Sequence, residues 1–119
     1  MARILLAEDD DSIRIFLARA LRRAGHEVCA LGDGETALSW VTGHEIDLLL
    51  ADVVMPGLDG IELARRASDM HPDIRVIFIT GFAAVALNET DVLPREATVL
   101  AKPFHLRQLV TEIERFMAA

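Results

Sequence analysis

The chain has 119 residues, of which 52% are hydrophobic and 26% are charged, and its formal net charge is −7. This length favours a single domain over residues 1–119, large enough to form a core without metal or disulfide support, and the single cysteine excludes an internal disulfide. No apolar run approaches the roughly 18 residues that cross a bilayer, and an acidic chain repels phosphate backbones, so we expect a cytoplasmic protein that neither inserts into membranes nor binds nucleic acid.

Short β-rich runs alternate with helical patterns along the whole chain. The runs that predict strands lie at residues 4–7, 27–31, 47–51, 74–79 and 98–101. The segments that predict helices lie at residues 13–24, 33–43, 61–67, within 82–97, and at 106–117. Gly25 is expected to end the first helix, and Asp33 is expected to cap the second. Asp10 or Asp11 can cap the first helix, and we assign that role mainly to Asp11 and Ser12.

Five strands separated by helices favour parallel pairing with right-handed crossovers. We therefore predict an α/β fold, a three-layer sandwich in which helices cover both faces of a five-stranded parallel sheet. The second predicted strand, Glu27 to Leu31, is more polar than the others and suits an edge of that sheet.

Polar side chains follow four of the predicted strands, at the point where each strand ends. They are Glu8, Asp9 and Asp10 after the first strand, Asp52 after the third, Thr80 after the fourth and Lys102 after the fifth. Each alone could be a helix cap or a solvated surface group, but open α/β sheets bind ligands at the carboxyl ends of their strands. Clustered carboxylates need a cation to neutralise them, and oxygen ligands without histidine or cysteine select Mg²⁺ or Mn²⁺.

This set of residues predicts a carboxylate that accepts a phosphoryl group beside a divalent cation. Asp52 is the candidate acceptor. In this interpretation the Thr80 hydroxyl would donate a hydrogen bond to one phosphoryl oxygen, and the Lys102 ammonium would pair with another. The four histidines of the chain show no metal-ligand spacing and predict no zinc site.

Four motifs, in order along the chain, resemble the response-regulator receiver domain of two-component systems. They are Glu8-Asp9, the segment Asp52 to Gly60, Thr80-Gly81, and Lys102-Pro103-Phe104. Each motif alone is weak, but the four in this order and at matching spacing are specific, and the resemblance covers the whole chain. It implies a flavodoxin-like or CheY-like sheet with strand order 2-1-3-4-5 and five helices.

The resemblance also implies a role for each matching residue. Asp52 would be the phosphoacceptor, while Glu8, Asp9, Asp52 and the backbone carbonyl of Val54 would bind Mg²⁺ or Mn²⁺. A histidine kinase or a histidine phosphotransfer protein would be the partner that exchanges phosphate with it. The chain would catalyse only its own phosphoryl transfer and dephosphorylation, so we expect a switch rather than an enzyme. One departure is Val99, because the family commonly has Tyr or Phe three residues before the lysine.

Because the chain ends at Ala119, we expect no effector domain and an output through partner binding. The segment Ile79 to Asn88 further resembles small single-domain receivers that act as adaptors of the ClpXP protease in cell-cycle proteolysis, with the unphosphorylated form active. A phosphorelay intermediate that passes phosphate to a histidine phosphotransfer protein, and a chemotaxis-type output protein, stay open as alternatives. The candidate partner surface is apolar. It consists of Phe82, Ala83, Ala84, Val85 and Leu87. About half of the residues of a short helix normally face the core of the protein, so any single one of these residues could equally be a core residue.

Overall fold

The structure, a computed structural model, describes residues 1–80, 98–101 and 105–118. The strands are β1 (Arg3–Ala7), β2 (Glu27–Leu31), β3 (Leu48–Asp52), β4 (Arg75–Thr80) and β5 (Thr98–Ala101). They form one sheet in the order β2-β1-β3-β4-β5, in which every neighbouring pair is parallel. The predicted fold class and strand order are therefore confirmed, and β2 lies at an edge of the sheet as predicted.

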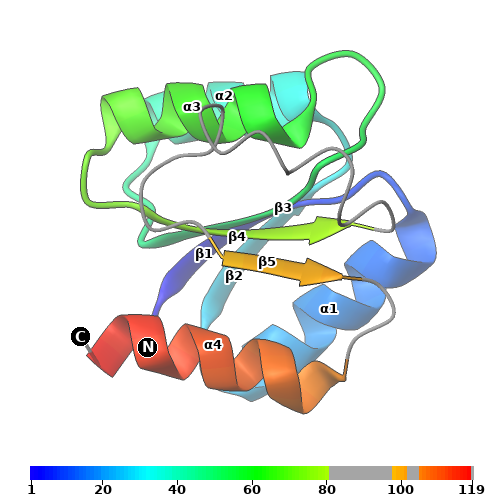
Figure 1. Ribbon diagram of the computed structural model, residues 1–119, viewed down its shortest axis with the longest axis vertical. Helices are drawn as coiled ribbons and strands as arrows, with labels where there is room; N and C mark the ends of the chain where they lie inside the picture. The colour runs from blue at the N-terminus through cyan, green and yellow to red at the C-terminus, as the bar shows by residue number, and fades with distance from the viewer. Residues whose placement is uncertain (81–97, 102–104, 119) are drawn as a thin grey trace.

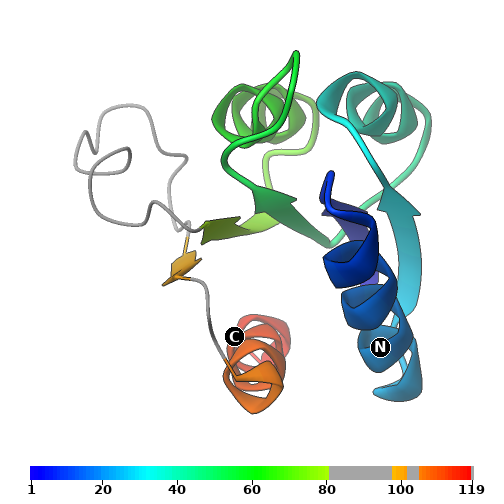
Figure 2. The same ribbon diagram turned by 90° about the vertical axis from the view of Figure 1, so that its right-hand side faces the viewer.

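Within the described residues, four helices cover the two faces of the sheet. They are α1 (Asp11–Arg23), α2 (Gly34–Gly43), α3 (Gly60–Met70) and α4 (Leu106–Ala118). Helices α2 and α3 lie on one face and α1 and α4 on the other, which gives the three predicted layers (Figures 1 and 2). The short helix predicted within residues 82–97 falls outside the described residues. Over the ranges that the structure covers, no helix has both the length and the apolar character to cross a membrane.

Strand β3 is buried on both faces because it lies in the middle of the sheet. Leu49 and Ala51 pack into the apolar cluster on the side of α2 and α3, whereas Leu48 and Leu50 pack into the cluster on the side of α1 and α4. Each of these four side chains is at most 1% exposed. Burial on both faces explains why the strand reads as a continuous apolar run instead of an alternating one. Asp52 therefore ends one of the most deeply buried segments of the molecule.

The end of α1 confirms the role predicted for Gly25. This residue has a φ of +98°, its N–H donates to the Arg22 carbonyl at 3.0 Å, and the His26 N–H donates to the Leu21 carbonyl at 3.2 Å. This pair of hydrogen bonds closes a helix over a left-handed residue, a conformation that glycine adopts without steric cost. The chain then turns directly into β2.

The helix starts confirm one predicted cap and correct another. Asp33 caps α2 as predicted, since its Oδ1 accepts a hydrogen bond from the Thr36 N–H at 2.7 Å. At α1 the prediction was wrong: Asp10 is the cap, and its Oδ1 accepts from the backbone N–H three residues later at 3.0 Å. The capping residue needs an extended backbone, which Asp10 has (φ −78°, ψ 116°), whereas Asp11 and Ser12 already lie in the first turn.

The edge strand β2 is covered in part by a side chain of α1. Arg22 Nη2 donates a hydrogen bond to the Val28 carbonyl at 3.0 Å. Cys29, in the same strand, is partly buried against the cluster on the side of α2 and α3, and burial raises the pKa of its thiol. A raised pKa keeps the thiol protonated and unreactive near neutral pH, so Cys29 acts as a packing residue.

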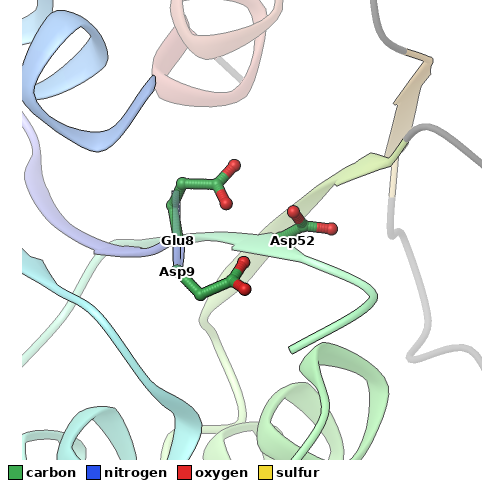
Figure 3. Close-up of side chains that lie close together, drawn as sticks. All are labelled: Glu8, Asp9 and Asp52. Atoms are coloured by element: carbon green, nitrogen blue, oxygen red, sulfur yellow. The ribbon is translucent and has the colours of Figure 1, made fainter. Parts of the chain in front are cut away.

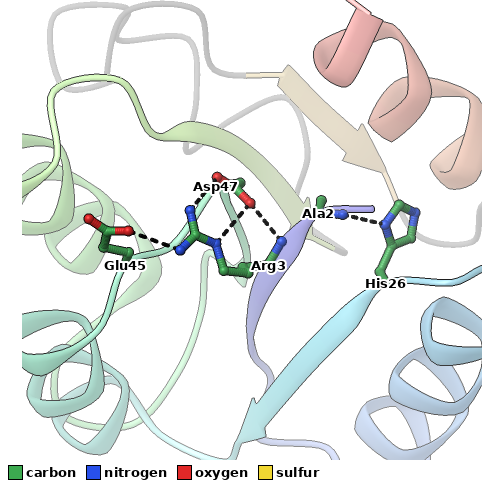
Figure 4. Close-up of polar contacts among 5 residues, drawn as sticks. All are labelled: Ala2, Arg3, His26, Glu45 and Asp47. Atoms are coloured by element: carbon green, nitrogen blue, oxygen red, sulfur yellow. Dashed lines mark hydrogen bonds and ion pairs between the residues drawn. The ribbon is translucent and has the colours of Figure 1, made fainter.

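Ion pairs gather at the amino ends of β1 and β3, the end of the sheet opposite Asp52. Arg3 Nη1 lies 3.0 Å from Glu45 Oε2, and Arg3 Nη2 lies 3.2 Å from Asp47 Oδ1 (Figure 4). The hydrogen bond from the Arg3 guanidinium holds the pKa of Asp47 below its ordinary value. Exposed ion pairs contribute little free energy singly, so these contacts chiefly fix how the segment before β3 enters the sheet.

His26 makes the stability of the fold depend on pH. Its Nδ1 accepts a hydrogen bond from the Ala2 N–H at 3.0 Å, so the ring is bound in its neutral form (Figure 4). Burial, and next the positive N-terminal amine, lower the pKa of His26 below its ordinary value of 6.5. The unfolded chain therefore binds the proton more readily, and this part of the stability is complete above about pH 6.5 and is lost as the pH falls below it.

Between about pH 7 and pH 5.5, we expect the free energy of unfolding to fall less for His26→Asn than for the native protein. Asparagine removes the titrating ring but keeps a side-chain oxygen that can accept from the Ala2 N–H. Urea unfolding at several pH values measures the difference, and His105→Asn, at an exposed histidine, is the matched control. A His26→Asn slope as steep as the native slope would contradict this account.

Candidate functional site

Three of the four carboxylates predicted at the strand ends lie together. Strands β1 and β3 are neighbours with Ala7 opposite Ala51, so Glu8 and Asp9 leave β1 beside Asp52 at the end of β3. One carboxylate oxygen from each of the three residues lies within 4.8 Å of the other two. Figure 3 shows Glu8 and Asp9 on one loop and Asp52 on the adjacent strand, with their side chains extending into the same region. The predicted convergence is confirmed for these three carboxylates, whereas Asp10 caps α1 and is not part of the cluster.

Two members of this acidic cluster are removed from water. Glu8 is 0% exposed and Asp52 is 6% exposed, whereas Asp9 lies at the surface. Glu8 Oε2 accepts a hydrogen bond from the Asp10 N–H at 3.1 Å, and Asp52 Oδ1 accepts one from the Val54 N–H at 3.1 Å. These bonds offset part of the cost of burying charge, but neighbouring buried carboxylates still repel each other. A cation between them would remove that repulsion.

The donor set fits a small, hard cation. All three side chains of the cluster are carboxylates, and it contains neither histidine nor cysteine. Mg²⁺ binds oxygen ligands at about 2.1 Å in an octahedron, which places neighbouring ligands about 3 Å apart. The three carboxylate oxygens, within 4.8 Å of one another, are close enough to approach a shared small cation. The exposed Asp9 leaves the cluster open to an ion that arrives from solvent.

Arg14 of α1 holds the loop that carries Glu8 and Asp9. Its Nη1 donates to the Glu8 carbonyl at 2.9 Å, and its Nη2 lies 2.6 Å from Asp11 Oδ1. The Glu8 N–H donates to the Leu31 carbonyl at 3.1 Å, so both backbone polar groups of Glu8 are satisfied. The sequence alone did not indicate this role of Arg14. The spacing of Asp11 and Arg14 indicates only a helix-surface ion pair, and nothing in it points to the contact with the Glu8 backbone.

The segment that follows Asp52, residues 53–59, is named here the β3–α3 loop. Its two ends meet, since the Gly60 N–H donates to the Val53 carbonyl at 3.0 Å. The Gly60 Cα lies so close to the Asp52 carbonyl that a Cβ there would overlap it. Asp59 caps α3, because its Oδ1 accepts from the Glu62 N–H at 2.8 Å. Helix α3 therefore begins in direct contact with the backbone of the acidic cluster.

The remaining predicted site residues are placed in part. Thr80 is the last residue of β4. The residue before it, Ile79, lies opposite Asp52 in the β3–β4 register. The backbone of Thr80 therefore reaches the carboxyl end of the sheet, where the acidic cluster lies. Val54 is 51% exposed, and Val99 is partly buried against the cluster on the side of α2 and α3. The other predicted site and surface residues lie outside the described residues: Lys102, Phe82, Ala83, Ala84, Val85 and Leu87.

Comparison with known proteins agrees with this geometry. The response regulator receiver domain family matches residues 4–114. The chain is 55% identical over 119 residues to the response regulator receiver protein CpdR of Brucella abortus, covering 100% of this chain and 99% of CpdR. It is 39% identical over 120 residues to the sensor kinase CckA of the same species, covering 98% of this chain but 12% of the kinase.

A solved structure agrees with the sequence comparison. The response regulator TrrA of Thermotoga maritima, in complex with Mg²⁺-BeF, is 26% identical with a TM-score of 0.83, covering 98% of this chain and 99% of TrrA. The family match spans nearly the whole chain, and both the strand order and the acidic cluster were expected for that family. The chain belongs to the response regulator receiver domain family.

Proposed function

We propose that this chain is a phosphorylation-controlled switch in which Asp52 accepts a phosphoryl group from a histidine kinase or a histidine phosphotransfer protein. The observation that carries the proposal is the convergence of Glu8, Asp9 and Asp52 at the carboxyl end of a parallel sheet. Membership of the receiver family supports it, and the similarity to part of the sensor kinase CckA supports the class of phosphodonor.

In the proposed reaction, a carboxylate oxygen of Asp52 attacks the phosphorus of a phosphohistidine. An O–P bond forms while the N–P bond breaks, and the imidazole nitrogen keeps the electron pair. The Val54 N–H, 3.1 Å from Asp52 Oδ1, fixes the carboxylate before attack. Glu8, Asp9, Asp52 and the Val54 carbonyl would hold Mg²⁺ or Mn²⁺, which supplies charge neutralisation to the phosphoryl oxygens when bound.

Two further residues are proposed to contact the phosphoryl group after transfer. The Thr80 hydroxyl would donate a hydrogen bond to one phosphoryl oxygen, and the Lys102 ammonium would pair with another. These contacts exist only in the phosphorylated form, so they provide the differential free energy that a switch requires. The position of Thr80 at the end of β4, one residue past the partner of Asp52 in the register, supports its part in this scheme.

For the output, we propose a cytoplasmic adaptor of the ClpXP protease that is active when unphosphorylated. The resemblance of the segment Ile79 to Asn88 supports this output, and the identity with CpdR over the full chain supports a single-domain regulator. Movement of Thr80 toward the phosphoryl group would disturb the adjoining apolar surface, and Val99 has no ring to bury in exchange. The proposed partner surface is Phe82, Ala83, Ala84, Val85 and Leu87.

Binding to ClpX tests this output. Native protein treated with acetyl phosphate and Mg²⁺ is expected to bind about tenfold more weakly than Asp52→Ala, which cannot be phosphorylated, a factor within the usual range of coupling energies. Asp69→Ala, at an exposed carboxylate of α3, is the matched control and should respond like the native protein.

Other results would change the assignment of the output. Stronger ClpX binding by the phosphorylated form would reverse the sign of the switch. If no form bound ClpX, and the phosphorylated form gave its phosphate to a histidine phosphotransfer protein, the chain would be a phosphorelay intermediate. Tight binding of a motility target by the phosphorylated form alone would favour the chemotaxis-type output.

A further inference from the structure

Glu35, in the first turn of α2, contacts the β3–α3 loop. Its Oε1 accepts a hydrogen bond from the Leu58 N–H at 2.9 Å, across 23 positions of sequence. The cap at Asp33 fixes the first turn from which this side chain leaves. This hydrogen bond joins the start of α2 to the β3–α3 loop and satisfies a backbone donor of that loop.

Backbone contacts strengthen this junction between α2 and the loop. Gly57 has a φ of +74°, and a Cβ at that residue would overlap the Glu35 carboxylate. A Cβ at Gly34 would overlap the Leu58 carbonyl. Gly34 therefore allows the backbone of the loop to rest directly on the start of α2, and a side chain at Gly57 would displace the Glu35 carboxylate from its present position.

The other end of the same loop belongs to the acidic cluster. The loop starts at Val53, next to Asp52, and the Val54 N–H donates to Asp52 Oδ1. Its base is closed by the hydrogen bond from Gly60 to Val53. Because the loop is closed at its base, a movement of Leu58 would have to be absorbed by the other residues of the loop, which include Val54. Ligand positions matter at the scale of about 0.5 Å.

We propose that Glu35 is a positioning residue for the cation site, holding the β3–α3 loop so that the Val54 backbone faces the acidic cluster. The inference rests on the proposed function, since it assumes that Glu8, Asp9, Asp52 and the Val54 carbonyl bind the cation. Glu35 acts through the reach of its side chain to the Leu58 amide, and its negative charge is incidental. Residues that orient metal ligands from outside commonly change affinity by tenfold or more when removed.

Calorimetric titration with Mg²⁺ separates reach from charge. Glu35→Ala removes both the reach and the charge of the side chain. Glu35→Asp keeps the charge but is one methylene too short. We expect both variants to bind Mg²⁺ about fivefold to tenfold more weakly than the native protein. Glu35→Gln keeps an oxygen at the same reach without the charge and is expected to bind within about twofold of the native protein. If charge mattered instead, the results for Asp and Gln would be exchanged.

One control variant and a second measurement extend the test. Glu45→Ala removes one negative charge at the opposite end of the sheet and should leave the affinity native. Hydrogen exchange at the Leu58 amide should accelerate in Glu35→Ala and Glu35→Asp but not in Glu35→Gln, while exchange at the buried Leu49 amide stays native in all three. Accelerated exchange at Leu49 as well would show global destabilisation and overturn the positioning role.

The reference for the cation site is Asp9→Ala, which removes a proposed ligand and should bind Mg²⁺ at least tenfold more weakly. Native affinity in Asp9→Ala would refute the proposed cation site itself, and with it the role of Glu35. Weak binding by Asp9→Ala together with native binding by Glu35→Ala would retain the cation site and overturn only the positioning role.

Discussion

Asp52→Asn is expected to abolish phosphorylation by acetyl phosphate, whereas the native chain should gain one phosphoryl group in the presence of Mg²⁺. An amide oxygen is a far poorer nucleophile than a carboxylate, so the chemical step is lost. The fold should be retained, because the asparagine Oδ1 can still accept from the Val54 N–H that now holds Asp52. Intact-mass measurement after a short incubation compares the two proteins directly.

Two controls complete this experiment. Asp69→Asn, at an exposed carboxylate of α3, should be labelled like the native protein. EDTA should suppress labelling of the native chain, since the phosphoryl oxygens and the acidic cluster would then repel each other without a cation. Full labelling of Asp52→Asn would place the phosphoryl group on another carboxylate and would remove Asp52 from the proposed role.

Gly60→Ala is expected to destabilise the fold by about 3 kcal/mol, a loss of roughly 10 °C in Tm for a chain of this size. In a helix, alanine is normally favoured over glycine by about 1 kcal/mol, so helix propensity alone predicts that this substitution would stabilise the fold. The contact decides the sign here, because the new Cβ would overlap the Asp52 carbonyl, and a backbone atom of the central strand cannot move aside cheaply. Thermal and urea unfolding measure the loss.

Gly43→Ala is the matched control for this substitution. Gly43 ends α2, and a Cβ there would meet no other atom within 4 Å. This variant should be as stable as the native chain or slightly more stable, since alanine loses less conformational entropy on folding. If Gly60→Ala were equally stable, α3 could shift away from Asp52, and the close contact at that point would not be required for folding.

Much of the fold could be predicted because its signals are local. The apolar run at residues 47–51 predicted the strand β3, and Gly25 and Asp33 marked a helix end and a helix start. The convergence of Glu8 and Asp52 needed one further step, the rule that parallel strands end at the same edge of a sheet. That step required only the order of the strands and no detailed coordinates.

The parts that could not be predicted depend on contacts between distant residues or on a choice between equivalent neighbours. Asp10 and Asp11 carry the same capping group, and only the backbone conformation in the folded chain selects Asp10. The contact between Glu35 and Leu58 joins the first turn of α2 to the β3–α3 loop across 23 positions of sequence. In the sequence, Glu35 is merely an acidic residue in the first turn of a helix, where it would also favour the helix dipole.

The arginine at the open edge of the sheet has a consequence for how the protein behaves at high concentration. An edge strand with free backbone groups can pair with the edge of another molecule, and such pairing begins aggregation. Arg22 already donates to the Val28 carbonyl of β2, so an incoming strand would have to displace a charged side chain before it could form a regular ladder. The helix that covers one face of the sheet thus also protects its border from self-association.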